Sequence, residues 1–243
     1  MNIQDKGARN QINIAPSVSG VLNIHVSGSD NAIHIGEDCK MSNLRIDINR
    51  NHCSISIEAG CTLAGEFNLR DHHTHLTVGA KTTMMGSKIS MHESGNIRIG
   101  KDCMFAGDIR MDTSDMHSIV DAATGQRINP PGDITIGNHV WLGLRVYVMK
   151  GVTIAEHCVI GAHAVVTHNI PSHSVAAGVP AKVIRSGVTW NRHRLPVNAK
   201  SRTASAHSNP PALTVLEAHS ESLSNFRKWL SLVKRRLTLR RQA

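Results

Sequence analysis

Apolar residues recur at a fixed interval over much of the chain. In the later part an aliphatic residue returns at every sixth position, at Ile136, Leu142, Val148, Ile154, Ile160 and Val166. A second apolar or small residue stands two positions before each of these, at Ile134, Val140, Val146, Val152, Cys158 and Ala164. A helix would show spacings of three and four, and a sandwich would show alternation broken by turns. A strict period of six instead predicts the short strands of a solenoid, with both series pointing inward.

A longer repeat precedes the six-residue period. Fragments in which two aliphatic residues flank a third residue, such as Ile12-Asn13-Ile14 and Leu76-Thr77-Val78, begin at residues 12, 33, 55, 76 and 97, and further copies begin at 134 and 152. The last spacing, 18 residues, makes one coil of three six-residue sides, each a short strand with a two-residue corner. Stacked coils of this kind form a triangular parallel β-helix. The earlier copies lie 21 or 22 residues apart, so about three extra residues per coil are expected in loops at one corner.

Glycine and cysteine fit this scheme. Glycines stand at the expected corners, where a positive φ costs them least, at positions 36, 79, 100, 137, 143 and 161. Cysteines at 39, 61, 103 and 158 each follow an inward Ile by four residues and are expected as small core residues, whereas Cys53 falls outside this register. The odd count of five without CxxC spacing indicates neither a disulfide framework nor a zinc site, and favours a reducing compartment.

Composition and charge narrow the class of protein. The chain of 243 residues is 40% apolar and 3% aromatic, which is typical of a folded protein with one sizeable core. It contains neither an apolar run long enough for a membrane span nor a secretory signal. The net charge of +9 arises from the end of the chain, because residues 1–190 hold 16 basic and 16 acidic residues and residues 191–243 hold 11 and 2. A neutral body with few aromatic residues disfavours nucleic acid as a partner.

The repeat defines the expected domains. It stops after Trp190, so residues 1–190 are expected to form the solenoid and residues 191–212 a linker. In residues 213–243, apolar positions spaced by three, four and seven lie among basic ones, which predicts an amphipathic helical tail. Such a tail could lie on an anionic membrane surface, pack on the solenoid or bind a partner, and these alternatives stay open.

One interval departs from the repeat. The copies at 97 and 134 are 37 residues apart, so about 16 residues leave the stack within a loop over 112–133. Long loops on a rigid scaffold are usually functional. This loop contains His117, whose side chain titrates near neutral pH, together with Asp112 and Asp115. Either aspartate, or a backbone carbonyl, could orient the imidazole.

Several segments together resemble the left-handed β-helix hexapeptide acyltransferases. They are the six-residue repeat and the stretches 114–119 (SDMHSI), 125–130 (GQRINP), 134–143 (ITIGNHVWLG) and 177–185 (AGVPAKVIR). The likeness is strongest to O-acetyltransferases of bacterial surface polysaccharides, including the sialic acid capsule enzymes. It implies an all-β fold, a left-handed parallel β-helix with an excursion loop, to which the C-terminal amphipathic helix is added. It also implies a homotrimer with active sites between subunits.

The resemblance assigns roles to single residues. It implies that His117 is the general base for direct transfer of an acetyl group from acetyl-CoA to a sugar hydroxyl of a capsule polysaccharide. Trp141, 24 residues later and on the outward side of its strand, is expected in the catalytic site beside the thioester. Further contacts with acetyl-CoA are expected at Gly143, Ala162, Thr167, Lys182 and Arg185. The last two would supply cations for the phosphates of CoA.

Other interpretations are weaker. The cluster Asp71-His72-His73-Thr74-His75 lacks a pattern that completes a metal site, so no metal is expected. An acetyltransferase for a small free sugar or an antibiotic, or a non-catalytic hexapeptide scaffold, are alternatives to the capsule enzyme. The expected location is the cytoplasm, with the inner face of the membrane as the alternative if the tail binds lipid.

Overall fold

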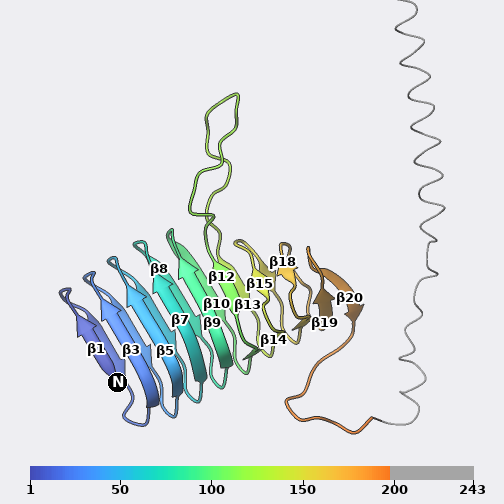
Figure 1. Cartoon of the computed structure of the whole chain (residues 1–243), viewed down its shortest axis with the longest axis horizontal. Coiled ribbons are helices and arrows are strands. Elements are labelled where there is room, and N and C mark those ends of the chain that lie inside the picture. Colours follow the sequence, from blue (N-terminus) through green and yellow to red (C-terminus); the bar gives the residue numbers. More distant parts are fainter. Residues whose placement is uncertain (198–243) are drawn as a thin grey trace, which may run out of the picture. The chain divides into compact units, whose positions relative to one another are not determined.

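The computed structural model describes residues 1–197, and the strands in this range wind into the stacked coils of a left-handed parallel β-helix (Figure 1). All twenty strands of the described residues lie in a first unit, Met1–Arg192, which extends two residues beyond the expected end at 190. The second unit is His193–Ala243, and most of the expected linker and the whole predicted helical tail, 213–243, lie outside the described residues. Within residues 1–197 the structure contains no helix that is long and apolar enough to cross a membrane.

The coils have three faces, which we number. The first face is a seven-stranded parallel sheet made of β2 (Gln11–Ile14), β4 (Ala32–Ile35), β6 (Ser54–Ile57), β8 (Thr74–Val78), β10 (Gly95–Ile99), β13 (Ile134–Ile136) and β16 (Thr153–Ile154). The second and third faces belong to one bent, thirteen-stranded sheet. Its long strands, which run over both faces in the early coils, are β3 (Ser19–Val26), β5 (Lys40–Ile48), β7 (Thr62–Leu69) and β9 (Thr83–Met91).

Later coils use separate short strands for these two faces. The second face continues through β11 (Met104–Phe105), β14 (Trp141–Leu142), β17 (Val159–Ile160) and β19 (Ser174–Ala177). The third face continues through β12 (Ile109–Asp112), β15 (Tyr147–Val148) and β18 (Val165–Val166). β1 (Asn2–Asp5) opens the stack beside β3, and β20 (Lys182–Ser186) ends it antiparallel to β19.

The predicted inward series form the core. All twelve residues of the two six-residue series are at most 2% exposed. Each stacks on its counterpart in the next coil, as Ile97 does on Ile134 and Leu142 on Ile160. All five cysteines are free and buried, including Cys53, which the six-residue register left unassigned. The interior is therefore a continuous column of aliphatic side chains that holds the outer faces at fixed positions.

The extra residues of the early coils lie at one corner, as expected. Ile89 is in register with Met111 and Val148 on the third face, and Ile99 with Ile136 and Ile154 on the first, so ten residues separate the two faces in the early coil and six in the late one. The added residues lie at the ends of β3, β5, β7 and β9, which are eight or nine residues long, and in the turns that lead to the first face. Each of these strands passes from the second face to the third without a break, and the register between neighbours shifts at that bend. A β-bulge lets a strand turn a corner while its backbone stays paired.

The corner glycines are required for a different reason from the one expected. None of the six predicted glycines has a positive φ. A Cβ atom built on Gly79 would lie 2.6 Å from the carbonyl carbon of Gly100, and one on Gly100 would lie 2.6 Å from that of Gly137. These glycines form a column in which stacked backbones approach too closely for any side chain. The left-handed corner positions are instead held by residues such as Asp102 and His139.

Replacing Gly100 with alanine should therefore destabilise the solenoid by about 1–3 kcal/mol, the usual cost of overpacking, because the obstructing atoms are backbone. Gly107→Ala is the matched control, since its Cβ would meet only Leu144 Cδ1 at 3.4 Å and its φ is not positive. Thermal unfolding followed by circular dichroism measures both. Equal midpoints for the two variants would contradict this account of the column.

Candidate active site

Residues 113–133 leave the stack after β12 and form an arm that projects from the solenoid (Figure 1). Val120 and Arg127 pair as an antiparallel bridge within it. Beyond the bridge, the Asp121 carboxylate accepts hydrogen bonds from the backbone of Ala123 and Thr124 and closes the turn. The solenoid resumes at β13 directly over β10. The arm therefore occupies the interval that breaks the repeat.

Charged and polar side chains fix the base of the arm. The Arg127 guanidinium donates to both carboxylate oxygens of Glu93 at 2.7 Å, and the Ser114 hydroxyl donates to the same carboxylate. These bonds, that of Arg127 foremost, lower the pKa of Glu93 to about 2. Asn129 joins the two sides of the arm, because its amide donates to the carbonyl of His117 and its oxygen accepts from the backbone of Ile119. The geometry of the arm is thus set by residues of the arm itself and of the neighbouring coil.

His117 is exposed, and only its backbone is held. Its N–H donates to the carbonyl of Asp115 at 2.7 Å, while within residues 1–197 its imidazole makes no hydrogen bond. Of the groups that could orient this ring, neither Asp112 nor Asp115 bonds to it within one chain. Asp112 pairs with Nδ1 of His92 at 2.6 Å, and Asp115 pairs with Lys150 at 2.6 Å. The imidazole is therefore available to a ligand or a neighbouring chain.

A hollow of about 310 Å³ lies on the third face at the foot of the arm. Its lining is rich in polar and cationic side chains and consists of Arg70, Lys88, Ser90, His92, Arg110, Met111, Asp112, Met116 and Tyr147. Lys88, Arg110 and Tyr147 stand in one outward column on successive coils. The acidic neighbours of Lys88 and Arg110 are exposed and lie at 3.7 and 3.6 Å, so they offset these charges weakly.

Two groups that line the hollow carry shifted pKa values, Asp112 half-buried and Tyr147 more exposed. Burial raises the pKa of Asp112, although the bonded His92 opposes the shift. Burial, and then the charge of Asp112, raises the pKa of the Tyr147 phenol, so the phenol stays a hydrogen-bond donor. The sequence analysis missed His92, Arg110 and Tyr147 because their alignment becomes visible only once the long strands are placed.

Three of the predicted acetyl-CoA residues come together on the second face. Trp141, on β14, is 38% exposed and stands in register with Met104 and Val159 of the adjacent coils. Gly143 follows it, and a Cβ there would lie 2.7 Å from the backbone nitrogen of Ala162. The N–H of Gly143 donates to the carbonyl of Ile160, so this group is not free to bind an oxyanion.

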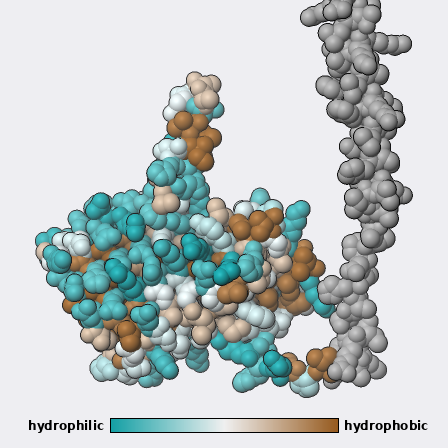
Figure 2. Space-filling view, in the orientation of Figure 1, coloured by the Kyte–Doolittle hydropathy of each residue, from teal (hydrophilic) through white to brown (hydrophobic). Residues whose placement is uncertain are grey.

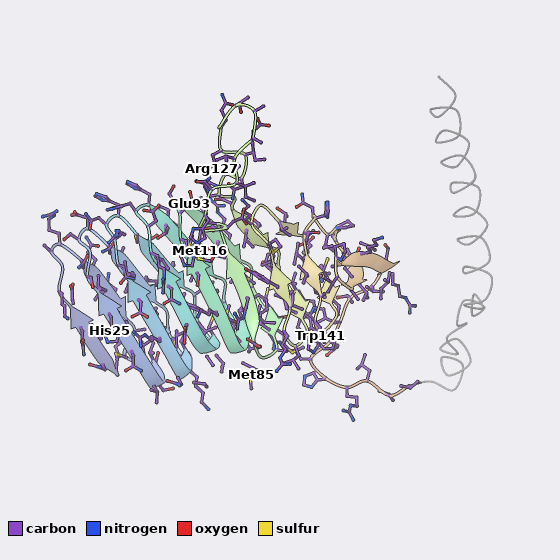
Figure 3. The ribbon with its side chains drawn as sticks, turned by 45° about the horizontal axis from the view of Figure 1, so that its top comes forward. His25, Met85, Glu93, Met116, Arg127 and Trp141 are labelled. Carbon is purple, nitrogen blue, oxygen red and sulfur yellow. The ribbon has the colours of Figure 1, made fainter. Side chains whose placement is uncertain are left out.

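The other predicted residues lie elsewhere in the chain. Thr167 follows β18 on the third face, where its hydroxyl bonds to His168, and the exposed Lys182 and Arg185 lie on β20. The arm and Trp141 are also separated, since Glu93, Met116 and Arg127 gather at the arm's base while Trp141 lies away from them (Figure 3). One chain therefore does not bring His117 and Trp141 together.

Trp190 is a further residue that sequence reasoning missed. It is 8% exposed, its ring stacks on His139 with centroids 4.1 Å apart, and it contacts the ring of Trp141 at 6.1 Å. It lies after the last strand, so the periodicity carries no signal for it.

The histidines of the segment 72–75 serve separate neighbours. The ring of His72 accepts a hydrogen bond from the backbone of Asn51, and that of His73 stacks on His52. His75 bonds to the hydroxyl of Ser54 at 2.8 Å. Within residues 1–197 no three side chains of the metal-ligating types converge.

Known proteins resemble this chain in both sequence and fold. Residues 133–168 match the family described as bacterial transferase hexapeptide (six repeats). The polysialic acid O-acetyltransferase of Neisseria meningitidis is 36% identical over 190 residues, which are 77% of this chain and 88% of that protein. The crystal structure of the polySia-specific acetyltransferase NeuO is similar with a TM-score of 0.75 and 28% identity, over 85% of this chain and 96% of that one. That of the polysialic acid O-acetyltransferase OatWY gives 0.73 and 32%, over 84% and 98%.

Replacing Glu93 with glutamine should loosen the arm, because it removes the carboxylate that holds Arg127. We expect faster tryptic cleavage after Arg127 at pH 8. The lowered pKa of Glu93 means that the pair stabilises the native arm fully above about pH 4.5 and loses this effect as the pH falls toward 2. Glu66→Gln, which breaks only an exposed pair with Lys88, is the control. If both variants are cut at the wild-type rate, the ion pair does not hold the arm.

Proposed function

Because the chain belongs to the hexapeptide-repeat acyltransferases, we propose that it transfers an acetyl group from acetyl-CoA to a hydroxyl of an acidic, sialic-acid-type surface polysaccharide. The observation that carries the proposal is the arm, in which the exposed His117 directly follows Met116, a residue that lines the cationic hollow. Membership of the family accounts for the acetyl transfer, and the hollow accounts for an acidic acceptor.

His117 would act as the general base. An alcohol is a weak nucleophile until its proton is removed, and a neutral imidazole accepts that proton as the oxygen attacks the thioester carbonyl. The tetrahedral intermediate then collapses with cleavage of the C–S bond, and the imidazolium returns the proton to the departing CoA thiolate. The products are the acetyl ester and free CoA, so no net proton is gained or lost. This role is supported by the free imidazole of His117 on a fixed backbone.

Direct transfer is favoured over a cysteine acyl-enzyme. All five cysteines are buried in the core, and thiols such as that of Cys61 donate to backbone carbonyls. Burial raises the pKa of Cys61 to about 12 and that of Cys103 to about 11. Because the thiolate is the nucleophilic form, these side chains have neither the charge nor the access that acyl transfer needs.

The site would be completed between neighbouring chains of a homotrimer. The arm exposes apolar side chains along its projecting part (Figure 2), namely Ile119, Val120 and Ile128, each more than half exposed. Apolar groups grouped on a projection are typical of a surface that another chain covers. The arm of one chain could then bring His117 to the Trp141, Gly143 and Ala162 of the next. Thr167 and the cations Lys182 and Arg185 would serve the nucleotide end of acetyl-CoA.

The cationic hollow would bind the acceptor. Arg70, Lys88 and Arg110 can donate charge-assisted hydrogen bonds to the carboxylates of an acidic sugar. His92, held by Asp112, and Tyr147 add donors for hydroxyl groups. We further propose a cytoplasmic location, where acetyl-CoA is available. The tail, for which membrane contact is one of the open alternatives, lies outside the described residues.

His117→Ala should lower acetyl transfer about 10²- to 10⁴-fold, the usual contribution of a general base, with little change in the binding of acetyl-CoA. His34→Ala, which removes an exposed histidine of β4, is the control. Turnover is measured as release of free CoA thiol with polysialic acid as acceptor. Wild-type turnover by His117→Ala would exclude this base.

Mixed assembly tests the shared site within the same experiment. Equal amounts of His117→Ala and Trp141→Ala chains, each inactive alone, should recover about a quarter of the wild-type sites when co-expressed, because half of the arms and half of the opposing faces are intact. No recovery in assembled mixtures would place both residues in one chain.

Arg110→Gln should raise the KM for polysialic acid about three- to ten-fold and weaken its dependence on salt, because one cation of the hollow is lost. The KM for acetyl-CoA should stay unchanged. Arg98→Gln, which removes an exposed arginine from the first face, is the matched control. Equal effects of both variants, or activity on free neutral sugars alone, would remove the acidic acceptor from the proposal.

A further inference from the structure

The chain returns along the solenoid after its last strand. Residues 188–192, here called the strap, follow β20 and lie along the corner that precedes the second face. The backbone N–H of Val188 donates to the carbonyl of His173 at 3.0 Å. Arg192, four residues later, reaches Asp102 and Thr83. The five residues of the strap thus run past several coils, back toward the N-terminal end of the solenoid.

A ladder of three histidines holds the strap. His139, His157 and His173 occupy equivalent left-handed corner positions with φ between 53° and 59°. The rings of His157 and His173 stack at 4.7 Å, and those of His139 and His157 lie 5.2 Å apart. Each ring bonds to a different strap residue in succession: His173 to the carbonyl of Val188, His157 to the hydroxyl of Thr189, and His139 to the carbonyl of Trp190.

The ion pair between Arg192 and Asp102, here called the clasp, fixes the C-terminal end of the strap. Arg192 donates to the Asp102 carboxylate at 2.9 Å, to the hydroxyl of Thr83 at 3.0 Å and to the carbonyl of Cys103 at 2.9 Å. Asp102 also bonds to Nδ1 of His139 at 2.7 Å. Burial alone would raise the pKa of Asp102, but the hydrogen bonds from His139 and Arg192 outweigh it and lower the pKa. The guanidinium of Arg192 also lies 5.5 Å from the centre of the Trp190 ring.

The clasp and the ladder meet at Trp190. Its indole N–H donates to the carbonyl of His139 at 2.7 Å, and its ring stacks on the imidazole of His139 within 8° of parallel. The buried ring of Trp190 then lies against the half-exposed ring of Trp141 at an angle of 54°. Tilted aromatic pairs of this kind are stabilising and directional. One wall beside Trp141 is therefore built by a segment outside the repeat.

We propose that the strap positions Trp141 for acetyl-CoA, with Trp190 as the positioning residue and the histidine ladder as its support. This inference rests on the proposed function, in which Trp141 contacts acetyl-CoA. An exposed indole on a flat strand has free rotamers, and ordering it before the ligand arrives avoids an entropic cost on binding. Within the first unit, Met1–Arg192, Trp190 supplies the aromatic ring that contacts Trp141. Loss of Trp190 would leave Trp141 in place but unrestrained.

Kinetics separate positioning from simple stability. Trp190→Ala should raise the KM for acetyl-CoA about three- to ten-fold, the range expected for one aromatic pair, while kcat and the KM for the acceptor stay near wild type. Trp190→Phe, which keeps a ring, should restore most of the affinity. Leu195→Ala, an exposed change beyond the strap, is the control. An unchanged KM for acetyl-CoA in Trp190→Ala, or an equal rise in both KM values, would overturn the proposal.

A second measurement needs no turnover. In a Trp229→Phe background, Trp190→Phe and Trp190→Ala leave Trp141 as the only tryptophan. Acrylamide should quench Trp141 fluorescence faster in the Ala variant, and calorimetry should show weaker acetyl-CoA binding. Quenching at one rate in both variants would overturn the proposal. If the wild-type protein binds acetyl-CoA but acetylates no glycan, the proposed function fails while the strap is still tested by these two readouts.

The ladder has a matched control elsewhere in the solenoid. His157→Ala removes the middle rung, which touches neither Trp141 nor Trp190, and should raise the KM for acetyl-CoA in the same direction. His52→Ala alters a histidine with nearly the same φ, 58° against 59°, which also stacks on one histidine of the next coil, His73. The backbone strain caused by replacing the residue at a left-handed φ should therefore be similar in the two variants. Equal KM values for the two variants would exclude the ladder as the support of Trp190.

Discussion

The close stacking of one coil on the next is the constraint on which the rest of this structure depends. Parallel strands about 4.8 Å apart leave no freedom along the axis, so each position of a coil lies over the same position of its neighbours. Inside, this produces the aliphatic columns, and at one corner the column of Gly79, Gly100 and Gly137, where only a hydrogen atom fits. Outside, it aligns Lys88 with Arg110 and His157 with His173. The side chains of the functional surfaces are therefore also aligned in columns that run along the solenoid.

Chemistry is concentrated where the stack is interrupted or ends. Within a coil almost every backbone group is engaged by a neighbour, as the N–H of Gly143 is by Ile160, so the coils themselves offer side chains but little free backbone. The arm between β12 and β13 and the strap after β20 are not part of this regular backbone pairing. Each is fastened to the solenoid by an ionic cluster, Glu93 with Arg127 in one case and Asp102 with Arg192 in the other. Two irregular segments thus rest on one regular scaffold.

Periodicity predicted the fold but only part of the site. The twelve inward residues, the triangular parallel β-helix and the break in the repeat followed from spacing, because burial imposes the period directly on the sequence. The left hand of the helix followed from the family resemblance. The long strands of the early coils did not, because a bulge changes the spacing without changing the residue types. Trp190 and the pair His92–Asp112 left no periodic signal, since their contacts join positions brought together only by coiling. The role of His117 came from resemblance and stays a proposal.

The way the arm is inserted has a consequence for how such proteins diversify. The two ends of the arm lie on consecutive coils, and Ile134 pairs in register with Ile97 despite the insertion between them. The scaffold thus tolerates a change of length or sequence in this insertion without any loss of pairing above or below it, since the cost of a longer loop rises only slowly with its size. Selection can therefore replace this insertion while the paired strands that carry it stay unchanged.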